Sequence, residues 1–158
     1  MATIPLTRRG AEKLKEELHR LKSVERHAVI AAISEARAQG DLSENAEYEA
    51  AKDKQGFVEG RILEVESKLA AALVIEPSGL NADGKVVFGA TVDLEDESTG
   101  VKVTYQIVGD DEADLKLGLV SISSPIARAL IGKEAGDTAE VHAPGGVKTW
   151  EVVEVRYL

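Results

Sequence analysis

The chain has 158 residues, a formal net charge of −9 and a sequence pI of about 4.9. This length suits one domain with a good core or two small domains, and so acidic a chain has no general basic surface for naked nucleic acid. The absence of cysteine excludes disulfides and thiolate metal sites. We find no signal peptide and no apolar run of membrane-spanning length, so we expect a cytoplasmic protein without membrane contacts.

The charge is distributed unevenly along the chain. Residues 1–75 carry 12 Lys/Arg against 13 Asp/Glu, whereas residues 76–158 carry 7 against 15. This asymmetry indicates two modules, and it predicts that the second, more acidic module meets a basic protein surface.

The segment from Thr7 to Gln39 predicts one long helix. Thr7 follows Pro5 and suits an N-cap, and Gly40 suits the position after the helix, where a positive φ costs glycine little. A helix over residues 8–39 would rise roughly 48 Å. Its apolar positions change from leucine to mostly smaller residues toward the far end: Leu14, Leu18, Leu21, Val24, Ala28, Ile30, Ala32, Ile33 and Ala36.

A second helix is predicted over residues 43–72, with an apolar stripe of Val58, Ile62, Val65, Leu69 and Ala72. The two helices have nearly equal lengths and a short connection, so they must pack antiparallel. We interpret the stripe as the core of an ordinary two-helix coiled coil. The hairpin module then covers residues 1–75, with its tip at residues 40–45.

Residues 76–84 are rich in turn formers and are predicted to be a linker. Short runs of period two follow at 86–88, 90–94, 101–108, 120–122, 139–142 and 150–155. One helix interrupts them, with Ser124 as its cap, Pro125 at its first position and Gly132 as its terminator, and residues 144–146 predict a hairpin turn. The predicted fold class is α+β: an N-terminal antiparallel coiled-coil hairpin, then a small antiparallel β-sheet domain with one helix over residues 85–158.

Two carboxylates, Asp41 and Glu44, lie three residues apart at the predicted tip. An Asp-x-x-Glu sequence ahead of a helix is a variant of the capping box, and this common motif is the simpler interpretation. Two features favour a further role. Glu44, Tyr48 and Lys52 recur as a polar stripe, and Leu42 stands between the acids, where a solvated turn is normally polar. Both interpretations hold if Asp41 caps in the unbound protein and binds elsewhere when docked.

Two carboxylates are too few for a private metal site. Mg²⁺ usually takes one or two protein carboxylates and completes its octahedron with water and substrate phosphates. A metal role for Asp41 and Glu44 therefore implies a site shared with another protein, where they could complete two-metal phosphoryl chemistry. We expect no cofactor on the isolated chain, and only weak Mg²⁺ binding.

Arg37, Lys52 and Lys54 lie close to the tip in the sequence. They are either ordinary helix-surface charges or a small cationic patch that touches nucleic-acid phosphates, and the patch is too small for independent binding. The three histidines have no ligand spacing, and no Ser/His/Asp set, Walker loop or G-x-G-x-x-G sequence occurs. The sequence therefore predicts no self-sufficient catalytic site.

Several blocks along the whole chain resemble the bacterial GreA/GreB family of transcript cleavage (elongation) factors, and within it the GreA members. In the first module the blocks are Ile4-Pro5-Leu6-Thr7-x-x-Gly10, Gly40-Asp41-Leu42-Ser43-Glu44-Asn45-Ala46-Glu47-Tyr48 and Gln55-Gly56-Phe57-x-Glu59-Gly60-Arg61-Ile62. In the second they are Ile107-Val108-Gly109-Asp110-Asp111-Glu112-Ala113-Asp114, Ser124-Pro125-Ile126-Ala127-Arg128 and Pro144-Gly145-Gly146.

The resemblance implies a non-enzymatic cofactor of bacterial RNA polymerase. The family's coiled coil enters the polymerase secondary channel, and its tip acids help hold the second Mg²⁺ and the attacking water at the polymerase active centre. The polymerase then hydrolyses the 3′ end of backtracked nascent RNA. By match, the acids would be Asp41 and Glu44, with Asn45 and Tyr48 in support.

Further residues gain roles by the same resemblance. Arg37 and Lys52 would contact RNA. The second module would be FKBP-like and would dock on the polymerase rim around residues 121–128, through Ser124, Pro125 and Arg128. We expect the protein to act as a monomer.

Two other classes of function compete with this interpretation. An FKBP-like module could be a prolyl isomerase, but such pockets are lined by aromatic residues, and beyond residue 75 the aromatics are Phe88, Tyr105, Trp150 and Tyr157. Alternatively the coiled coil could dimerise as a scaffold, with the tip serving only as a cap.

Overall fold

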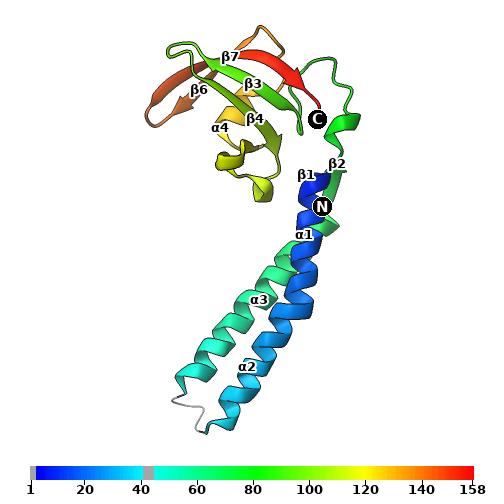
Figure 1. Ribbon diagram of the computed structural model, residues 1–158, viewed down its shortest axis with the longest axis vertical. Helices are drawn as coiled ribbons and strands as arrows, with labels where there is room; N and C mark the ends of the chain where they lie inside the picture. The colour runs from blue at the N-terminus through cyan, green and yellow to red at the C-terminus, as the bar shows by residue number, and fades with distance from the viewer. Residues whose placement is uncertain (1–2, 41–44) are drawn as a thin grey trace. The chain divides into compact units, whose positions relative to one another are not determined.

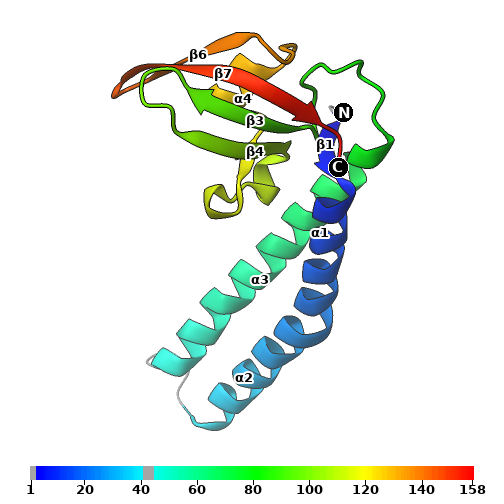
Figure 2. The same ribbon diagram turned by 45° about the horizontal axis from the view of Figure 1, so that its top comes forward.

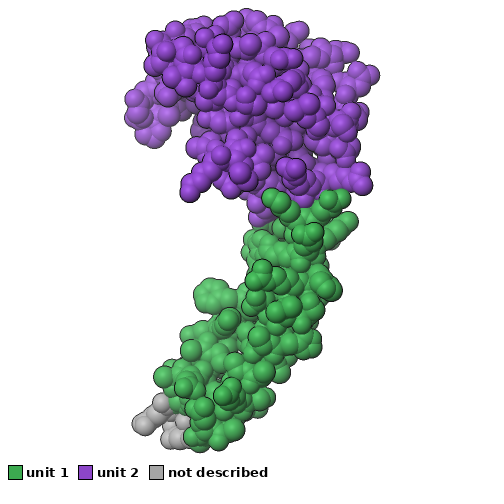
Figure 3. Space-filling view, in the orientation of Figure 1, with its two compact units in different colours: residues 1–2, 11–72 green, residues 3–10, 73–158 purple. Residues whose placement is uncertain are grey.

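A computed structural model describes residues 3–40 and 45–158. Their contacts divide the chain into two compact units, which Figure 3 shows in green and purple. The first unit contains residues 11–72, and the second contains residues 3–10 and 73–158. The N-terminal strand, which we expected within the hairpin module, is thus counted with the second unit.

The first unit is a helical hairpin (Figure 1). Its first arm comprises α1 (Arg8–Arg20), the π-helical turn η1 (Leu21–Glu25) and α2 (Arg26–Ala38), and its second arm is α3 (Ala46–Ala70). Helices α2 and α3 run side by side in Figure 1 and in Figure 2. The predicted ends of the first helix are confirmed: Thr7 Oγ1 accepts from the Gly10 N–H at 3.1 Å, and Gly40 has a φ of 118°. The second helix ends at Ala70, before the predicted residue 72, because Ala72 begins strand β2.

One apolar seam holds the arms together. On α3 the buried residues Val58, Ile62 and Val65 follow the alternating four- and three-residue spacing of a coiled coil. On the first arm this spacing breaks, because the buried Val29 lies eight residues, not seven, beyond Leu21. The extra residue falls at η1, where a π turn takes up one residue more than an α turn.

The π turn corrects four of our predicted core positions, since Ala28 and Ala32 are exposed in addition to the two larger residues that follow. Val24 and Ile30, which we placed on the apolar stripe, are 55% and 49% exposed. The shift of one residue places the seam on Val29, which we did not predict, and on Ile33 and Ala36, which we did. The signal for this shift was present in the sequence, since Leu21 and Val29 are eight residues apart.

Ion pairs flank the seam on both sides of the hairpin. Arg61 donates to both carboxylate oxygens of Glu17, at 2.5 and 2.8 Å, and Arg26 donates to both oxygens of Glu59, at 2.8 Å each. These hydrogen bonds hold the pKa values of the Glu17 and Glu59 carboxyls below their ordinary values. Both pairs therefore stabilise the hairpin only while the carboxyls are ionised.

The second unit is built on a five-stranded sheet in the order β5-β4-β3-β7-β6 (Figure 2). Its strands are β3 (Thr91–Asp96), β4 (Lys102–Val108), β5 (Leu119–Ser121), β6 (Thr138–Ala143) and β7 (Gly146–Arg156). Strands β4 and β5 pair in parallel and the other pairs are antiparallel. The predicted α+β class is confirmed, and this parallel pair is a departure from the all-antiparallel sheet that we expected.

Helix α4 (Pro125–Leu130) supplies Ala127 and Leu130 to the core of the sheet. Its predicted cap is confirmed, since Ser124 Oγ accepts from the Ala127 N–H at 3.2 Å. The strand predicted at residues 86–88 is wrong. Val86 instead exchanges two backbone hydrogen bonds of 2.8 Å with the chain after α4, at Gly132 and Lys133, and is fully buried there.

The N-terminal strand β1 (Ile4–Thr7) pairs with β2 (Ala72–Ile75) in a separate two-stranded sheet. Short 3₁₀ turns η3 (Pro77–Gly79), η4 (Asp110–Glu112) and η5 (Leu115–Leu117) complete the fold. The Glu112 carboxylate accepts from the backbone N–H groups of Thr7, at 3.1 Å, and Gly109, at 3.0 Å, and from the Thr7 hydroxyl. One side chain thus fastens the N-terminal strand within the second unit.

Gly10 lies against this carboxylate, and its substitution gives a test of the contact. A Cβ at Gly10 would fall 2.0 Å from Glu112 Cδ, so Gly10→Ala must displace a carboxylate that holds three donors. We expect a loss of roughly 2–3 kcal/mol in the unfolding free energy of the second unit. The measurement is urea unfolding followed by the fluorescence of Trp150, the single tryptophan, which is buried in this unit.

Gly56→Ala is the matched control for Gly10→Ala. No atom lies within 4 Å of a Cβ built at Gly56, so the substitution should raise helix stability by about 1 kcal/mol. An unchanged Trp150 midpoint in Gly10→Ala would contradict the proposed role of Glu112.

The ion pairs of the hairpin predict a dependence of its stability on pH. Because the folded pKa values of Glu17 and Glu59 are lowered, their stabilisation is present above the unfolded value of 4.5 and is lost as pH falls through the folded values. We expect the thermal midpoint of the helical signal in circular dichroism to fall between pH 6 and pH 3. The double variant Glu17→Gln/Glu59→Gln should show a smaller fall, and an equal fall would contradict this account.

Candidate functional site

The candidate site lies where the two arms of the hairpin meet. Asp41 and Glu44, the predicted metal-binding acids, lie outside the described residues. Their neighbours in the sequence are described: Gly40 follows the end of α2, and Asn45 is the N-cap of α3. The segment that carries both acids therefore connects the ends of the two arms.

Asn45 joins the two arms through its side-chain amide. Its Oδ1 accepts from the Tyr48 N–H at 3.0 Å, which caps α3, and its Nδ2 donates to the Ala36 carbonyl of α2 at 2.8 Å. We predicted Asn45 only as a support of the tip and assigned the cap to the acids. The signal for its role was available in the sequence, since asparagine is among the strongest N-cap residues.

Arg37 and Tyr48 meet across the hairpin next to this link. The Arg37 guanidinium carbon lies 5.9 Å from the centre of the Tyr48 ring, within the range of a cation–π contact. Tyr48 also packs against the apolar seam. The structure thus brings these two predicted site residues together and gives the ring a structural role at the end of the seam.

Lys52 lies one turn beyond Tyr48 on α3 and is exposed. Its Nζ donates to Gln55 Oε1 at 3.2 Å, a contact along the helix surface. The position leaves Lys52 and Arg37 as two exposed cations close to the end of the hairpin. Both interpretations of these cations, surface charge and phosphate contact, are compatible with this geometry.

The described part of the chain offers no metal site of its own. Across residues 3–40 and 45–158, no group of three or more His, Asp or Glu side chains is placed to hold a metal ion.

The predicted docking region of the second unit surrounds the start of α4. Pro125 and Arg128 are exposed, whereas the Ser124 hydroxyl is engaged as the helix cap. Next to them the Asp110 carboxylate accepts from the hydroxyls of Ser123, at 2.7 Å, and Ser121. These bonds fix the loop that leads into α4, so Pro125 and Arg128 are presented on an ordered surface.

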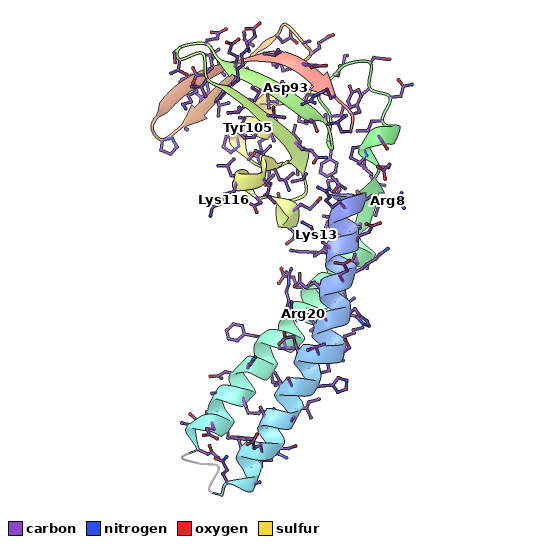
Figure 4. All side chains as sticks on the ribbon, viewed as in Figure 1. Arg8, Lys13, Arg20, Asp93, Tyr105 and Lys116 are labelled. Carbon is purple, nitrogen blue, oxygen red and sulfur yellow. The ribbon has the colours of Figure 1, made fainter. Side chains whose placement is uncertain are left out.

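The outward side of the sheet concentrates negative charge. Asp93 of β3 lies opposite Glu154 of β7, and Glu95 lies opposite Glu151. Like charges directly opposite each other destabilise a sheet. Here Arg156 donates to the Asp93 carboxylate at 2.9 Å, and Lys102 of β4 lies opposite Glu95. Figure 4 labels Asp93 on this side; Tyr105, on β4, packs against the core.

Three of the four aromatic residues of the second unit contribute to its core, and the fourth, Tyr157, makes a surface hydrogen bond. Trp150 is buried, Phe88 and Tyr105 pack against the same core cluster, and the Tyr157 hydroxyl donates to the Lys85 carbonyl at 2.5 Å. None of these contacts resembles the aromatic lining that a prolyl-isomerase pocket requires.

A small cavity lies in the first unit, on the face of the hairpin that carries the Arg26–Glu59 pair. Its volume is about 170 Å³, and it is lined by Arg26, Val29, Ile30, Gln55, Val58 and Glu59. Half of the lining residues are apolar, and the one carboxylate among them, Glu59, is already bound by Arg26, so we assign the cavity no chemistry.

Two family models match the chain and together cover most of it. One, described as transcription elongation factor, N-terminal, matches residues 4–74, and the other, described as transcription elongation factor, GreA/GreB, C-terminal, matches residues 81–157. None of the helices described here is long and apolar enough to cross a membrane.

Known proteins resemble the chain over its full length. It is 72% identical to the transcription elongation factor GreA of Verminephrobacter eiseniae, over 99% of both chains. It is 71% identical to that of Ralstonia nicotianae, over 100% of both chains. Among solved structures, GreA factor homolog 1 of Thermus thermophilus matches with 27% identity and a TM-score of 0.44, covering 98% of this chain and 99% of that one.

Substitutions of Asn45 test whether its amide holds the tip together. Asn45→Ala removes both hydrogen bonds and should cost about 1–2 kcal/mol of hairpin stability. Asn45→Asp keeps an acceptor for the Tyr48 N–H but loses the donor to Ala36, so its loss should be smaller. Hydrogen exchange of the Tyr48 amide measures the effect directly, and equally slow exchange in Asn45→Ala and in the unsubstituted protein would contradict the role.

Proposed function

We infer the function of this chain from the family to which it belongs, the GreA/GreB transcription elongation factors, and from the hairpin described above. We propose that the chain inserts its hairpin into the secondary channel of bacterial RNA polymerase. There it stimulates the polymerase's own Mg²⁺-dependent hydrolysis of the 3′ end of backtracked nascent RNA. Arrested complexes are thereby returned to elongation.

The observation that carries this proposal is the position of Asp41 and Glu44 in the segment joining two long helices. Helix α3 alone has 25 residues and spans roughly 38 Å. A hairpin of this length, closed by Asn45 and thin because its end is lined by alanine, suits a narrow and deep channel. Its acids could then reach an active centre that the rest of the chain does not touch.

The chemistry follows from the number of acids that the tip provides. In the complex, Asp41 and Glu44 add one or two carboxylates to a Mg²⁺ ion whose remaining ligands are polymerase acids, water and RNA phosphate. Asp41 and Glu44 would help hold this ion, which when bound would supply the lowered pKa of a coordinated water that phosphodiester hydrolysis needs. The chain itself is therefore a non-enzymatic cofactor, and the polymerase performs the catalysis.

Other residues take supporting roles in the proposal. Arg37 and Lys52 contact RNA phosphates close to the 3′ end, while Asn45 and Tyr48 keep the ends of the two arms together. The exposed Pro125 and Arg128, beside the Ser124 cap, dock on the channel rim. The protein acts in the cytoplasm as a monomer, because a hairpin paired with a second copy could not enter a channel.

Cleavage by a backtracked elongation complex with 5′-labelled RNA and Mg²⁺ tests the proposal. The unsubstituted protein should shorten the RNA from its 3′ end. Asp41→Asn and Glu44→Gln should still bind but lower the cleavage rate by roughly 100-fold. Glu47→Gln is the matched control, because it neutralises an exposed acid in the first turn of α3 and should cleave normally.

Two other outcomes would change the assignment. Binding without cleavage by the unsubstituted protein would make it a channel-occupying regulator whose tip acids serve only as caps. Full cleavage by the double variant Asp41→Asn/Glu44→Gln would remove the acids from the mechanism.

A further inference from the structure

One face of α3 carries large apolar side chains that no part of the hairpin covers. Phe57 is 80% exposed and Leu63 is 67% exposed. Between them in the sequence lies Gly60, and Gly56 lies one turn before it. We call the exposed surface of Gly56, Phe57, Gly60 and Leu63 the outer face of α3.

Helical geometry places these residues away from the seam. Gly56, Gly60 and Leu63 are spaced by four and three residues, so they share one side of the helix. The seam residues Val58 and Ile62 lie on the opposite side, two positions after each glycine. The outer face thus points away from the other arm of the hairpin.

The ion pairs of neighbouring residues show on which flank of the helix Phe57 and Leu63 lie. Phe57 lies one turn before Arg61, which binds Glu17 on one flank of the hairpin. Leu63 lies one turn after Glu59, which binds Arg26 on the other flank. Phe57 and Leu63 therefore lie on either side of the row formed by Gly56 and Gly60. We call this row, which carries no side chains, the trough.

The glycines have no internal reason to be glycine. After proline, glycine is the residue that least favours an α-helix, yet no atom lies within 4 Å of a Cβ built at Gly56 or Gly60, and neither glycine has a positive φ. A missing side chain allows another backbone to approach closely. With an exposed aromatic beside it, this is the surface that a second helix would need.

The charge around the trough selects the occupant. Toward the tip the same side of α3 carries two exposed acids, Glu49 and Asp53, and one exposed cation, Lys52, so the acids are in excess. A second copy packed in parallel would set Asp53 against itself, and such a like-charge contact is costly. In an antiparallel pair Asp53 would lie near Glu64, which is ion-paired with Arg61 and Lys68, and the cross-link described below distinguishes that arrangement. A helix with apolar residues and basic neighbours fits both the shape and the charge.

We propose that the outer face of α3 docks a basic, apolar-faced α-helix of the RNA polymerase when the hairpin is inserted. This inference rests on the proposed function and adds to it a second contact surface, distinct from the tip acids and from the region around α4. Phe57 is its anchor, and Gly56 and Gly60 allow the close approach. The face contributes to binding and takes no part in the chemistry at the tip.

The test measures binding and cleavage separately with the full-length chain and a backtracked elongation complex. Phe57→Ala removes the anchor, and Gly60→Leu fills the trough with a residue that favours helix more than glycine does. Each should raise the dissociation constant by about tenfold or more, with cleavage at saturating protein unchanged within about twofold. Ile30→Ala, an exposed apolar residue on α2, is the matched control and should bind normally.

A charge reversal and a cross-link identify the occupant. Asp53→Lys should weaken binding, because it opposes a basic partner, and tighter binding by this variant would overturn the proposal. A photo-crosslinking amino acid in place of Phe57 should capture a helical segment of the polymerase. Capture of RNA, or of a second copy of the chain, would equally overturn it.

The remaining outcomes separate this inference from the proposed function. If Phe57→Ala and Gly60→Leu bind as tightly as the unsubstituted protein while cleavage proceeds, the docking face is wrong and the proposed function stands. If the unsubstituted protein neither binds nor stimulates cleavage, the docking face and the proposed function are both wrong.

Discussion

Two helices that have only each other to pack against must keep their apolar residues in phase along their whole length. In this chain α3 keeps the phase with regular spacing, while the first arm carries one residue too many. The π turn η1 absorbs that residue, and the seam continues through Val29, Ile33 and Ala36. Without it, the tip-side half of the first arm would turn its apolar residues toward water. The order of the tip therefore depends on a turn that lies far from it along the helix.

The same constraint explains why the arms are joined by hydrogen bonds near the tip and by ion pairs farther from it. The seam becomes narrow toward the tip because its residues become small. There, polar contacts hold the arms together: Asn45 links them by hydrogen bonds, and Arg37 lies over the ring of Tyr48. Farther from the tip, bidentate ion pairs at Glu17 and Glu59 flank the seam. A thin but closed hairpin results, which is what the proposed insertion requires, and its outer face remains available for a partner helix.

Local chemistry was predictable from the sequence, and long-range contacts were not. Thr7, Gly40 and Ser124 were identified as helix boundaries because caps depend on a few neighbouring residues. The π turn was missed because we did not test the seven-residue spacing of the first arm, which the eight-residue step from Leu21 to Val29 breaks. The contact of Glu112 with Thr7 joins residues 105 positions apart, and the pairing of Val86 with the chain after α4 left no periodic signal. At the tip we assigned the helix cap to the acids and not to Asn45, whose amide links the arms.

The central claim of the proposed function is that the tip of the hairpin reaches the metal ion at the polymerase active centre. Replacing Mg²⁺ by Fe²⁺ in the active centre generates hydroxyl radicals that cut polypeptide near the ion. With the end-labelled chain bound to the polymerase, the account predicts cuts confined to residues 40–45 and abolished by excess Mg²⁺. Cuts elsewhere in the chain, or an intact chain despite demonstrated binding, would contradict the central claim.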